Sequence, residues 1–213
     1  MKRVTALLLA AMMIITTGLI TPAMAAEDDV PETYSNAYVV MDAKTGQVLL
    51  QKNMYEKEYP ASITKILTTA LGLTYAKSED RITVSQETVS DVWKWGETTH
   101  LALEPGEIIT LKDALYGAMV ESANDCANAI AQAVSGSLTD FAELMNQQVA
   151  ALGLSDTHFT NAHGLPDKDH YTTAYDMARI TRWAMTVPGF EEYFCATEYT
   201  IPKTNKKDVA RNI

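Results

Sequence analysis

The pattern of hydrophobic and polar positions predicts strands near the start of the chain and helices through its middle. Two runs rich in β-prone residues, at 37–42 and 47–51, flank a turn that ends on Gly46, and this arrangement is typical of a β-hairpin. Residues 62–75 are apolar nearly all round, which indicates a buried central helix. The first third of the chain therefore predicts a small sheet followed by a core helix.

Later segments give weak strand signals and clearer helix signals. Strand candidates lie at residues 81–84 and 197–202, helix candidates at residues 111–120, 126–134, 138–152 and 173–185, and an irregular segment at residues 85–110. Thr173 and Asp176 have the spacing of a capping box at the start of the last helix. Strands, a buried helix, a run of helices and a last strand candidate follow one another, and this order indicates an α+β fold with a helical subdomain inserted in a sheet-bearing domain. Because a two-stranded hairpin is not a stable sheet alone, we expect further strands to complete the sheet.

The start of the chain has the three-part pattern of a secretory signal peptide. Lys2 and Arg3 precede an apolar run at residues 4–20, and Ala23-Met24-Ala25 is a small-x-small cleavage pattern. The alternative is an uncleaved membrane anchor, which the shortness of the run disfavours. We therefore expect an exported protein of the cell envelope, acting outside the cytoplasm. Its predicted parts are a signal peptide at residues 1–25, a flexible leader at residues 26–36 and a partial catalytic domain at residues 37–213.

Composition argues against two classes of protein. With 47% hydrophobic residues, the 213-residue chain has enough apolar side chains to bury a core, so it is not intrinsically disordered. Its formal net charge of -10 makes nucleic acid a poor partner. We expect Cys126 and Cys195 to be two separate core residues instead of a disulfide framework. The four histidines lack zinc-ligand spacing, so we assign no metal and no cofactor.

Ser62 and Lys65 are the first candidates for chemistry. A serine hydroxyl is a weak nucleophile that needs a base close by, and a spacing of three places both side chains on one face of a helix. The electropositive start of a helix and an apolar environment both favour the neutral amine that such a base requires. A helix-capping serine and a solvated lysine would produce the same pattern, so the pair alone leaves both interpretations open.

Ser122-Ala123-Asn124 is the second candidate, because it lies between two predicted helices. A hydroxyl there could relay a proton between the lysine and a leaving group. An amide could both donate to a substrate carbonyl and accept from a substrate N–H. Ordinary helix capping by Ser122 or Asn124 would explain the tripeptide as well, so it carries no weight by itself.

Together, Ser-x-x-Lys, Ser-x-Asn 60 residues later and an export signal resemble the penicillin-binding proteins and serine β-lactamases. Within that group the chain is similar to the D-alanyl-D-alanine carboxypeptidases of the low-molecular-weight penicillin-binding class, over residues 37 to about 205. The similar segments are residues 60–69, 122–128, 161–166 and 170–176. The resemblance implies an acyl-enzyme mechanism and the α+β fold shared by β-lactamases and penicillin-binding transpeptidases. In that fold an antiparallel sheet, which we expect to be incomplete in this chain, packs on a buried helix beside a helical subdomain.

The resemblance also implies a role for each candidate residue. By it, Ser62 is the acylated nucleophile and Lys65 is the proton acceptor. Ser122 completes the proton relay, and Asn124 contacts the substrate backbone. His163 lies in a family-like loop whose neighbouring glycine and proline indicate a shaped turn, and we interpret this histidine as structural.

The third motif of that family, Lys-Thr-Gly on a strand beside the nucleophile, does not follow Asn124 in this sequence. Lys44-Thr45-Gly46 matches by letter but lies in the predicted hairpin turn, and we reject the near match Lys203-Thr204-Asn205. The missing strand would supply a cation for the substrate carboxylate and an oxyanion N–H, whose loss can cost roughly 100-fold in rate. We therefore expect an incomplete domain, and a 213-residue chain that is inactive or poorly folded by itself.

The main interpretation is a serine-type D-Ala-D-Ala carboxypeptidase that trims peptidoglycan stem peptides and is acylated by β-lactams. A serine β-lactamase is the first alternative, with Glu143 as a candidate for the glutamate that positions the deacylating water in class A enzymes. Its place in a patterned helix indicates a surface residue instead. A non-catalytic peptidoglycan-binding module is the second alternative. Membrane association would require a segment that is not present in this chain.

Overall fold

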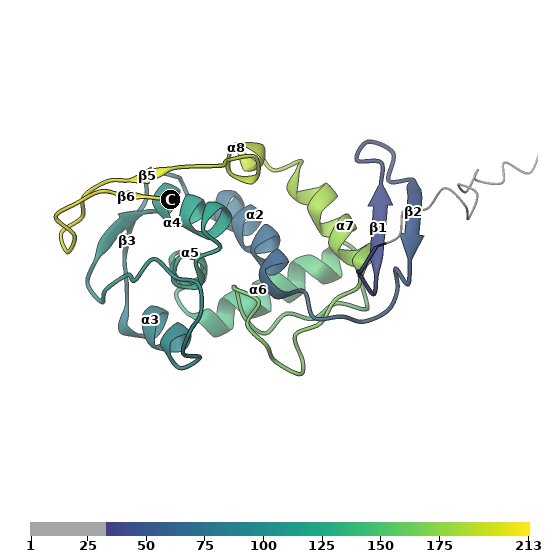
Figure 1. The fold of residues 1–213 in the computed structure, drawn as a ribbon, viewed down its shortest axis with the longest axis horizontal. Helices are drawn as coiled ribbons and strands as arrows, with labels where there is room; N and C mark the ends of the chain where they lie inside the picture. Colours follow the sequence, from purple (N-terminus) through teal and green to yellow (C-terminus); the bar gives the residue numbers. More distant parts are fainter. Residues whose placement is uncertain (1–32) are drawn as a thin grey trace, which may run out of the picture. The chain divides into compact units, whose positions relative to one another are not determined.

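The structure is a computed structural model that describes residues 33–213. The predicted signal peptide, and the predicted leader as far as residue 32, lie outside the described part of the chain. Residues 34–213 form one unit that combines a core of helices with three two-stranded antiparallel sheets (Figure 1). This mixture confirms the α+β class, although the described strands form three small sheets instead of one. No helix in this part of the chain is long and apolar enough to cross a membrane.

The predicted hairpin is formed by β1 (Tyr38–Met41) and β2 (Val48–Lys52), which pair antiparallel. Its turn is closed by Asp42, whose carboxylate accepts a hydrogen bond from the backbone N–H of Thr45 at 2.7 Å. Gly46 has a φ of 77°, a conformation that glycine adopts without a steric penalty. The lysine-threonine-glycine sequence at this position is therefore a hairpin turn, as predicted.

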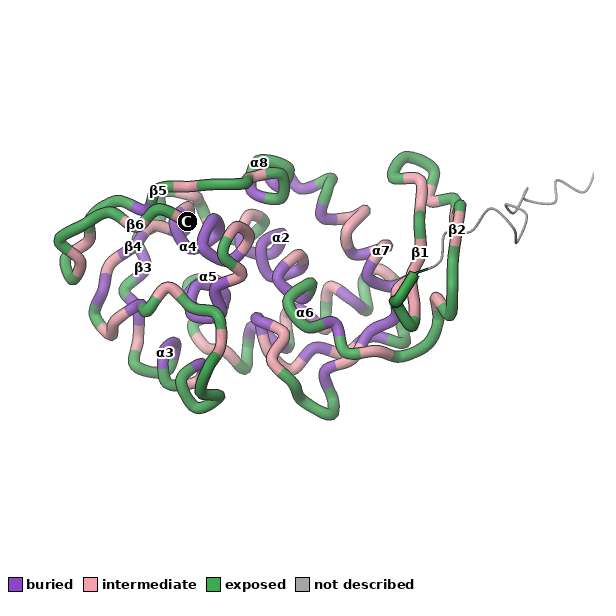
Figure 2. The backbone as a smooth tube through the Cα atoms, in the orientation of Figure 1, coloured by how far each residue is buried: buried purple, intermediate pink, exposed green. Residues whose placement is uncertain are grey.

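The predicted central helix begins as a 3-10 turn, η2 (Ala61–Thr64), and continues as α2 (Lys65–Tyr75). A Cβ at Gly72 would lie 2.9 Å from the side chain of Ile130, so glycine allows a neighbouring helix to pack closely on α2. Figure 2 shows α2 largely in the colour of buried residues. The helices that cover it include α4 (Leu111–Val120), α5 (Asn124–Ser135) and α7 (Ala174–Ala184).

The remaining elements surround this core. They are β3 (Arg81–Thr83), α3 (Gln86–Trp93), β4 (Ile108–Thr110), α6 (Leu138–Ala151), α8 (Phe190–Phe194), β5 (Thr200–Ile201) and β6 (Arg211–Asn212). Helix α5 begins two residues earlier than predicted, so Asn124 is its first residue and Ala123 its N-cap. The second candidate motif therefore lies at the very start of a helix.

The prediction of irregular structure for residues 85–110 is wrong at both ends of that segment, where α3 and β4 are found. Helix α3 is capped by Ser85, whose hydroxyl accepts the N–H of Thr88 at 3.1 Å, and it buries Val89 and Val92. Its sequence is short and rich in β-branched and hydroxyl residues, which have modest helix propensity. Tertiary packing, which the sequence pattern does not show, therefore decides this helix.

The start of α7 is where it was predicted, but its capping box is only half formed. The Thr173 side chain accepts the N–H of Asp176 at 3.0 Å. The Asp176 carboxylate accepts instead from the hydroxyl of Thr157 at 2.7 Å, so the reciprocal bond is absent from this described helix end. A complete capping box is found at α4, between Thr110 and Asp113.

The two cysteines are separate, as predicted, but only one lies in the core. Cys126 is fully buried, and a Cβ at Gly117 of α4 would lie 2.5 Å from its sulfur. Cys195 is exposed and both thiols are free. The expectation that both are core residues is therefore wrong for Cys195, which directly follows the short helix α8.

Candidate active site

Ser62 and Lys65 are brought together at the junction of η2 and α2. A 3-10 helix has about three residues per turn and places residues i and i+3 in line. The Lys65 Nζ donates a hydrogen bond to the Ser62 Oγ at 3.3 Å. Ser62 is exposed, whereas Lys65 is 2% exposed. The predicted pair is therefore formed, with the hydroxyl open to solvent and the amine enclosed.

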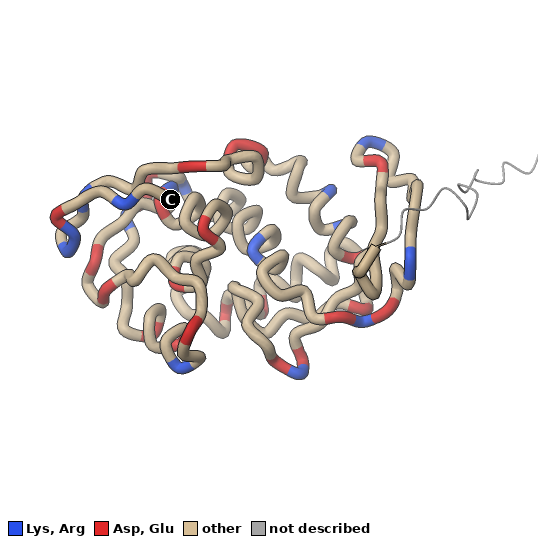
Figure 3. The backbone as a smooth tube through the Cα atoms, viewed as in Figure 1, with Lys and Arg blue, Asp and Glu red and all other residues tan. Residues whose placement is uncertain are grey.

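The Lys65 amine has an uncharged second partner, the backbone carbonyl oxygen of His163, at 2.8 Å. Burial lowers the pKa of Lys65 to about 8, because desolvation disfavours the ammonium form. A thiolate at Cys126 would oppose this shift, but burial raises the pKa of that thiol well above its usual range, so it is uncharged near neutral pH. Lys65 is also the only charged residue of α2, and in Figure 3 this helix is tan apart from a short blue stretch near its start. The site thus holds an amine that is partly neutral near physiological pH.

Residues 160–165, which we call the strap, lie along the start of α2. Besides the contact with the lysine amine, the Thr68 hydroxyl donates to the carbonyl oxygen of Ala162 at 2.7 Å. The Thr64 hydroxyl lies 2.9 Å from the Nε2 of His170, just beyond the strap. Three buried polar side chains at the start of this helix therefore find their hydrogen-bond partners in the strap and in His170, about 100 residues away in the sequence.

Gly164 allows the strap to approach the turn that carries the nucleophile candidate. It has a φ of 89°, and a Cβ there would lie 1.8 Å from the carbonyl oxygen of Ala61. Ala61 itself has a φ of 48°, which is uncommon for a residue with a side chain. Such strain persists only where the surroundings hold it, so the strap and this turn fix each other.

The imidazole of His163 is 2% exposed and uses both of its nitrogens. The Nε2 lies 3.0 Å from the Oδ2 of Asp91, and the Nδ1 accepts the N–H of Leu165 at 3.1 Å. Burial lowers the pKa of His163 even though Asp91 acts in the opposite direction. The hydrogen bond from His163 holds the pKa of Asp91 well below its usual range. The two groups are therefore a neutral imidazole and a carboxylate.

Ser122 lies in the turn between α4 and α5, and Asn124 is the first residue of α5. These two helices pack together against α2. Ser122 is half-buried with a φ of 57°, and Asn124 is 5% exposed. Two backbone bonds of 3.0 Å fix this turn, from Ala123 N–H to Gly117 and from Asn124 N–H to Thr99. Among residues 33–213, no hydrogen bond links the side chains of this motif to those of the first pair. The two motifs therefore share a helical core without direct contact through hydrogen bonds.

Asp125 is a site residue that the sequence analysis missed. Its fully buried carboxylate accepts backbone N–H groups from Leu101, Leu103 and Cys126 at distances of 2.9 to 3.1 Å. It thereby ties the preceding loop to the first turn of α5. Its position directly after Ser-x-Asn, where an acidic residue suits a helix start, was the available signal. Asp91 was missed because α3 was not predicted.

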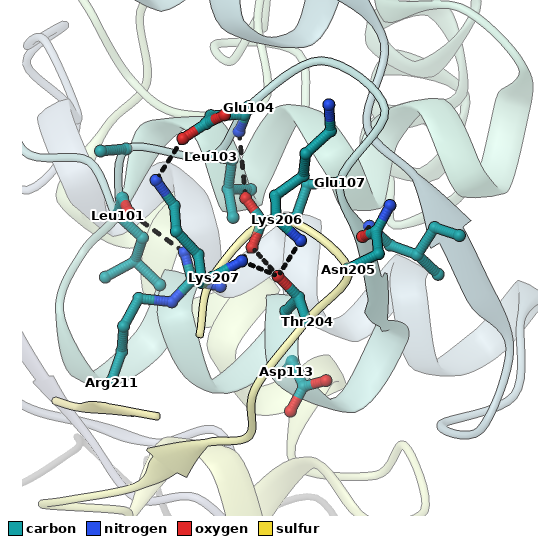
Figure 4. A network of polar contacts seen from close by, with 12 residues as sticks. Leu101, Leu103, Glu104, Glu107, Asp113, Thr204, Asn205, Lys206, Lys207 and Arg211 are labelled. Carbon is teal, nitrogen blue, oxygen red and sulfur yellow. Dashed lines mark hydrogen bonds and ion pairs between the residues drawn. The ribbon is translucent and has the colours of Figure 1, made fainter. Parts of the chain in front are cut away.

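Within the rejected near match Lys203-Thr204-Asn205, the last two residues belong to a different network, shown in Figure 4. The Thr204 hydroxyl donates to the fully buried carboxylate of Glu107 at 2.9 Å. Arg211 pairs with the same carboxylate at 2.6 Å. These contacts fasten the β5–β6 segment to the loop before β4, and this structural use agrees with the rejection.

Glu143 is exposed on α6, as the sequence pattern indicated. An exposed side chain on a regular helix gives no support to the class A β-lactamase alternative, which needs a glutamate at the acylated serine. Within residues 33–213, no group of three His, Cys, Asp or Glu side chains could hold a metal ion. The candidate groups for the chemistry are two serine hydroxyls, one lysine amine and one asparagine amide.

Comparison with known proteins gives concordant matches. The family profile described as D-alanyl-D-alanine carboxypeptidase matches residues 23–212. The D-alanyl-D-alanine carboxypeptidase DacF of Bacillus subtilis is 34% identical over 218 residues, which cover 97% of this chain and 54% of the relative. DacC of Escherichia coli is 36% identical over 170 residues, covering 74% of this chain and 42% of that protein. The chain thus spans about half the length of the curated relatives it matches.

Solved structures agree with this assignment. The D-alanyl-D-alanine carboxypeptidase DacD from Francisella tularensis has a TM-score of 0.76 and 27% identity, with 93% of this chain and 48% of that chain covered. A D-alanyl-D-alanine carboxypeptidase from Mycobacterium tuberculosis has a TM-score of 0.78 and 25% identity, with 90% and 69% covered. The fold is therefore that of the penicillin-binding transpeptidases, and the chain belongs to the D-alanyl-D-alanine carboxypeptidase family.

Proposed function

We propose that this chain carries the acylation machinery of a serine-type D-Ala-D-Ala carboxypeptidase that trims peptidoglycan stem peptides. The observation that supports it most is the buried Lys65 amine, hydrogen-bonded to the exposed Ser62 hydroxyl at 3.3 Å. A pKa of Lys65 near 8 leaves roughly a tenth of the amine neutral at pH 7, enough for a general base. A helix-capping serine beside a solvated lysine would need neither the burial nor the contact.

In the proposed reaction, the Ser62 Oγ attacks the carbonyl carbon of the penultimate D-Ala while its proton passes to the Lys65 amine. The tetrahedral intermediate collapses with cleavage of the peptide bond. The departing amine of the terminal D-Ala takes up a proton that returns from the lysine ammonium. The products are free D-Ala and an acyl ester on Ser62, which water then hydrolyses to regenerate the hydroxyl.

The second motif is proposed to act on the substrate side. Ser122 would relay the proton between Lys65 and the leaving amine, and Asn124 would bind the substrate backbone through its amide. Both side chains lack hydrogen bonds to the first pair among residues 33–213, which leaves them available for these contacts. β-Lactams are proposed to acylate the same serine.

The wider setting is also a proposal. We infer that residues 1–25 direct export and that residues 37–213 form part of a catalytic domain in the cell envelope. The sequence printed here contains the two earlier motifs in their family order.

Labelling with a fluorescent penicillin tests this proposal in the full-length gene product. Ser62→Ala should abolish covalent labelling, and Lys65→Met should slow it by about 100- to 10,000-fold, because general bases contribute in that range. Ser155→Ala and Lys168→Met, both at exposed positions, are matched controls that should label normally. Labelling that persists in Ser62→Ala would contradict the assignment of the nucleophile.

A second measurement separates the carboxypeptidase from its alternatives. The full-length protein should release D-Ala from a peptide ending in D-Ala-D-Ala and should form a long-lived penicilloyl ester. Rapid penicillin turnover without D-Ala release would instead indicate a β-lactamase. Binding of peptidoglycan without either reaction would indicate a non-catalytic module.

A further inference from the structure

We propose that Asp91 and His163 act as a positioning pair for the Lys65 base: the carboxylate fixes the imidazole, and the histidine backbone then holds its carbonyl oxygen against the amine. This inference rests on the proposed function of Lys65. In this proposal α3 and the strap contribute to the reaction by positioning the base, and neither contacts the substrate.

The hydrogen bonds of His163 define its protonation. The Nδ1 accepts the backbone N–H of Leu165 at 3.1 Å, so this nitrogen carries no proton. The Nε2 therefore carries the proton and donates it to Asp91 at 3.0 Å. With both nitrogens occupied, the imidazole has no free position from which to accept the Ser62 proton. His163 is consequently a positioning residue and not a second base.

The backbone of the same residue makes the contact that matters for catalysis. Its carbonyl oxygen accepts from the Lys65 Nζ at 2.8 Å, shorter than the 3.3 Å from that amine to Ser62. The amine is thus held mainly by the strap. Rotation of the peptide unit at His163 would move this acceptor, and the ring that Asp91 holds opposes such a rotation.

Asp91 is itself tied to other elements. Its Oδ2 accepts from the Asn128 amide at 3.0 Å, and its Oδ1 pairs with Lys94 at 2.6 Å. Asn128 lies one turn after Asn124 on α5, so the carboxylate joins the strap to the helix that carries the second motif. The charged groups around the imidazole are Asp91, Lys94 and Lys65.

The surroundings of the pair fit positioning better than contact with reactants. Asp91, Asn128 and the start of the strap line a cleft of about 460 Å³, whose lining does not include Ser62 or Lys65. Asp91 therefore lies at this cleft, and His163 connects it to the base through hydrogen bonds. A shift of about 1 Å in a positioned reacting group can cost about 100-fold in rate, so a loosened carbonyl at His163 should have a measurable effect.

Stopped-flow acylation by a fluorescent penicillin tests the pair in the full-length gene product. Asp91→Asn and His163→Phe should lower the limiting acylation rate by about 10- to 100-fold. The half-saturating penicillin concentration and the fraction of protein labelled should stay close to the parent values. His163→Gln keeps an N–H donor toward Asp91 and should recover part of the rate. Asp156→Asn, at an exposed ion pair with Lys57, is the matched control and should react like the parent.

The double variant Asp91→Asn/His163→Phe completes a thermodynamic cycle. If the two residues act as one unit, it should be no slower than the slower single variant. Multiplied losses in the double variant would overturn the proposal, as would a normal rate in His163→Phe. A reduced labelled fraction with a normal rate would show a purely structural role and would overturn it too. A parent protein that is never labelled would refute the proposed function itself, and this inference with it.

Discussion

The turns that carry Ser62 and Ser122 are stabilised in different ways. Hydrogen bonds hold the side chains of Ser62 and Lys65 in place, whereas at Ser122 they hold the backbone and leave the side chains free of the first pair. The Lys65 amine bonds to the Ser62 hydroxyl and to the strap. The turn at Ser122 is held through backbone bonds and through the carboxylate of Asp125. Its own hydroxyl and the Asn124 amide have no bond to the first pair among residues 33–213.

This difference matches the tasks proposed for the two motifs. A base must be desolvated and aligned before the substrate arrives, because its pKa and its geometry both depend on the surrounding protein. Groups that bind a substrate must instead keep hydrogen-bonding capacity free until it arrives. Both turns hold a residue with a side chain at positive φ, Ala61 and Ser122, and such strain is typical of functional sites.

Gly164→Ala should disrupt the packing of the strap on the turn that carries Ser62, and it should destabilise the protein more than the other variants. The new Cβ would fall 1.8 Å from the backbone oxygen of Ala61 at a φ of 89°, and backbone cannot yield as a side chain can. We expect a loss of more than about 3 kcal/mol of unfolding free energy in urea denaturation. Gly136→Ala, at a φ of 80° with no atom within 4 Å, should lose only about 1–2 kcal/mol. Equal losses of unfolding free energy in the two variants would show that the strap is not closely packed against this turn.

Asp125→Asn should destabilise the turn that carries Ser122 without affecting the Ser62–Lys65 pair. The carboxylate accepts hydrogen bonds from backbone N–H groups, and the NH₂ of an asparagine amide cannot accept them. We therefore expect a loss of about 2 kcal/mol of unfolding free energy. Penicillin acylation should slow, while its pH dependence should keep the midpoint set by Lys65. Asp140→Asn, exposed in the first turn of α6, should cost less than about 1 kcal/mol. A shifted midpoint in Asp125→Asn would mean that the two regions are not independent.

Ser122→Gly should give the smallest change in stability, and in the opposite direction. Relief of the left-handed backbone at a φ of 57° should raise the unfolding free energy by about 1 kcal/mol. The same variant should acylate more slowly because the relay hydroxyl is gone. Asn53→Gly, at a φ of 47° in the hairpin region, should not slow acylation. A Ser122→Gly protein that reacts normally would remove this serine from the proton path.

Local patterns predicted the local parts of the site. The apolar run at residues 62–75 indicated the buried helix, and the spacing of three placed Ser62 and Lys65 on one face. The contacts of His163 with Lys65 and Asp91 could not be predicted in this way. His163 lies 98 residues beyond Lys65 and 72 residues beyond Asp91 in the sequence. Helix α3, which carries Asp91, forms through packing that its weak helical sequence does not reveal.

The pH dependence of penicillin acylation shows whether the desolvated Lys65 amine is the base for Ser62. Burial lowers the pKa of Lys65 to about 8, so the neutral amine predominates above that pH and the ammonium below it. The acylation rate of the full-length protein should therefore rise about tenfold per pH unit below 8 and level off above it. A rate that does not change across pH 8, or that keeps rising toward the ordinary pKa range of lysine without levelling off, would contradict this role of Lys65.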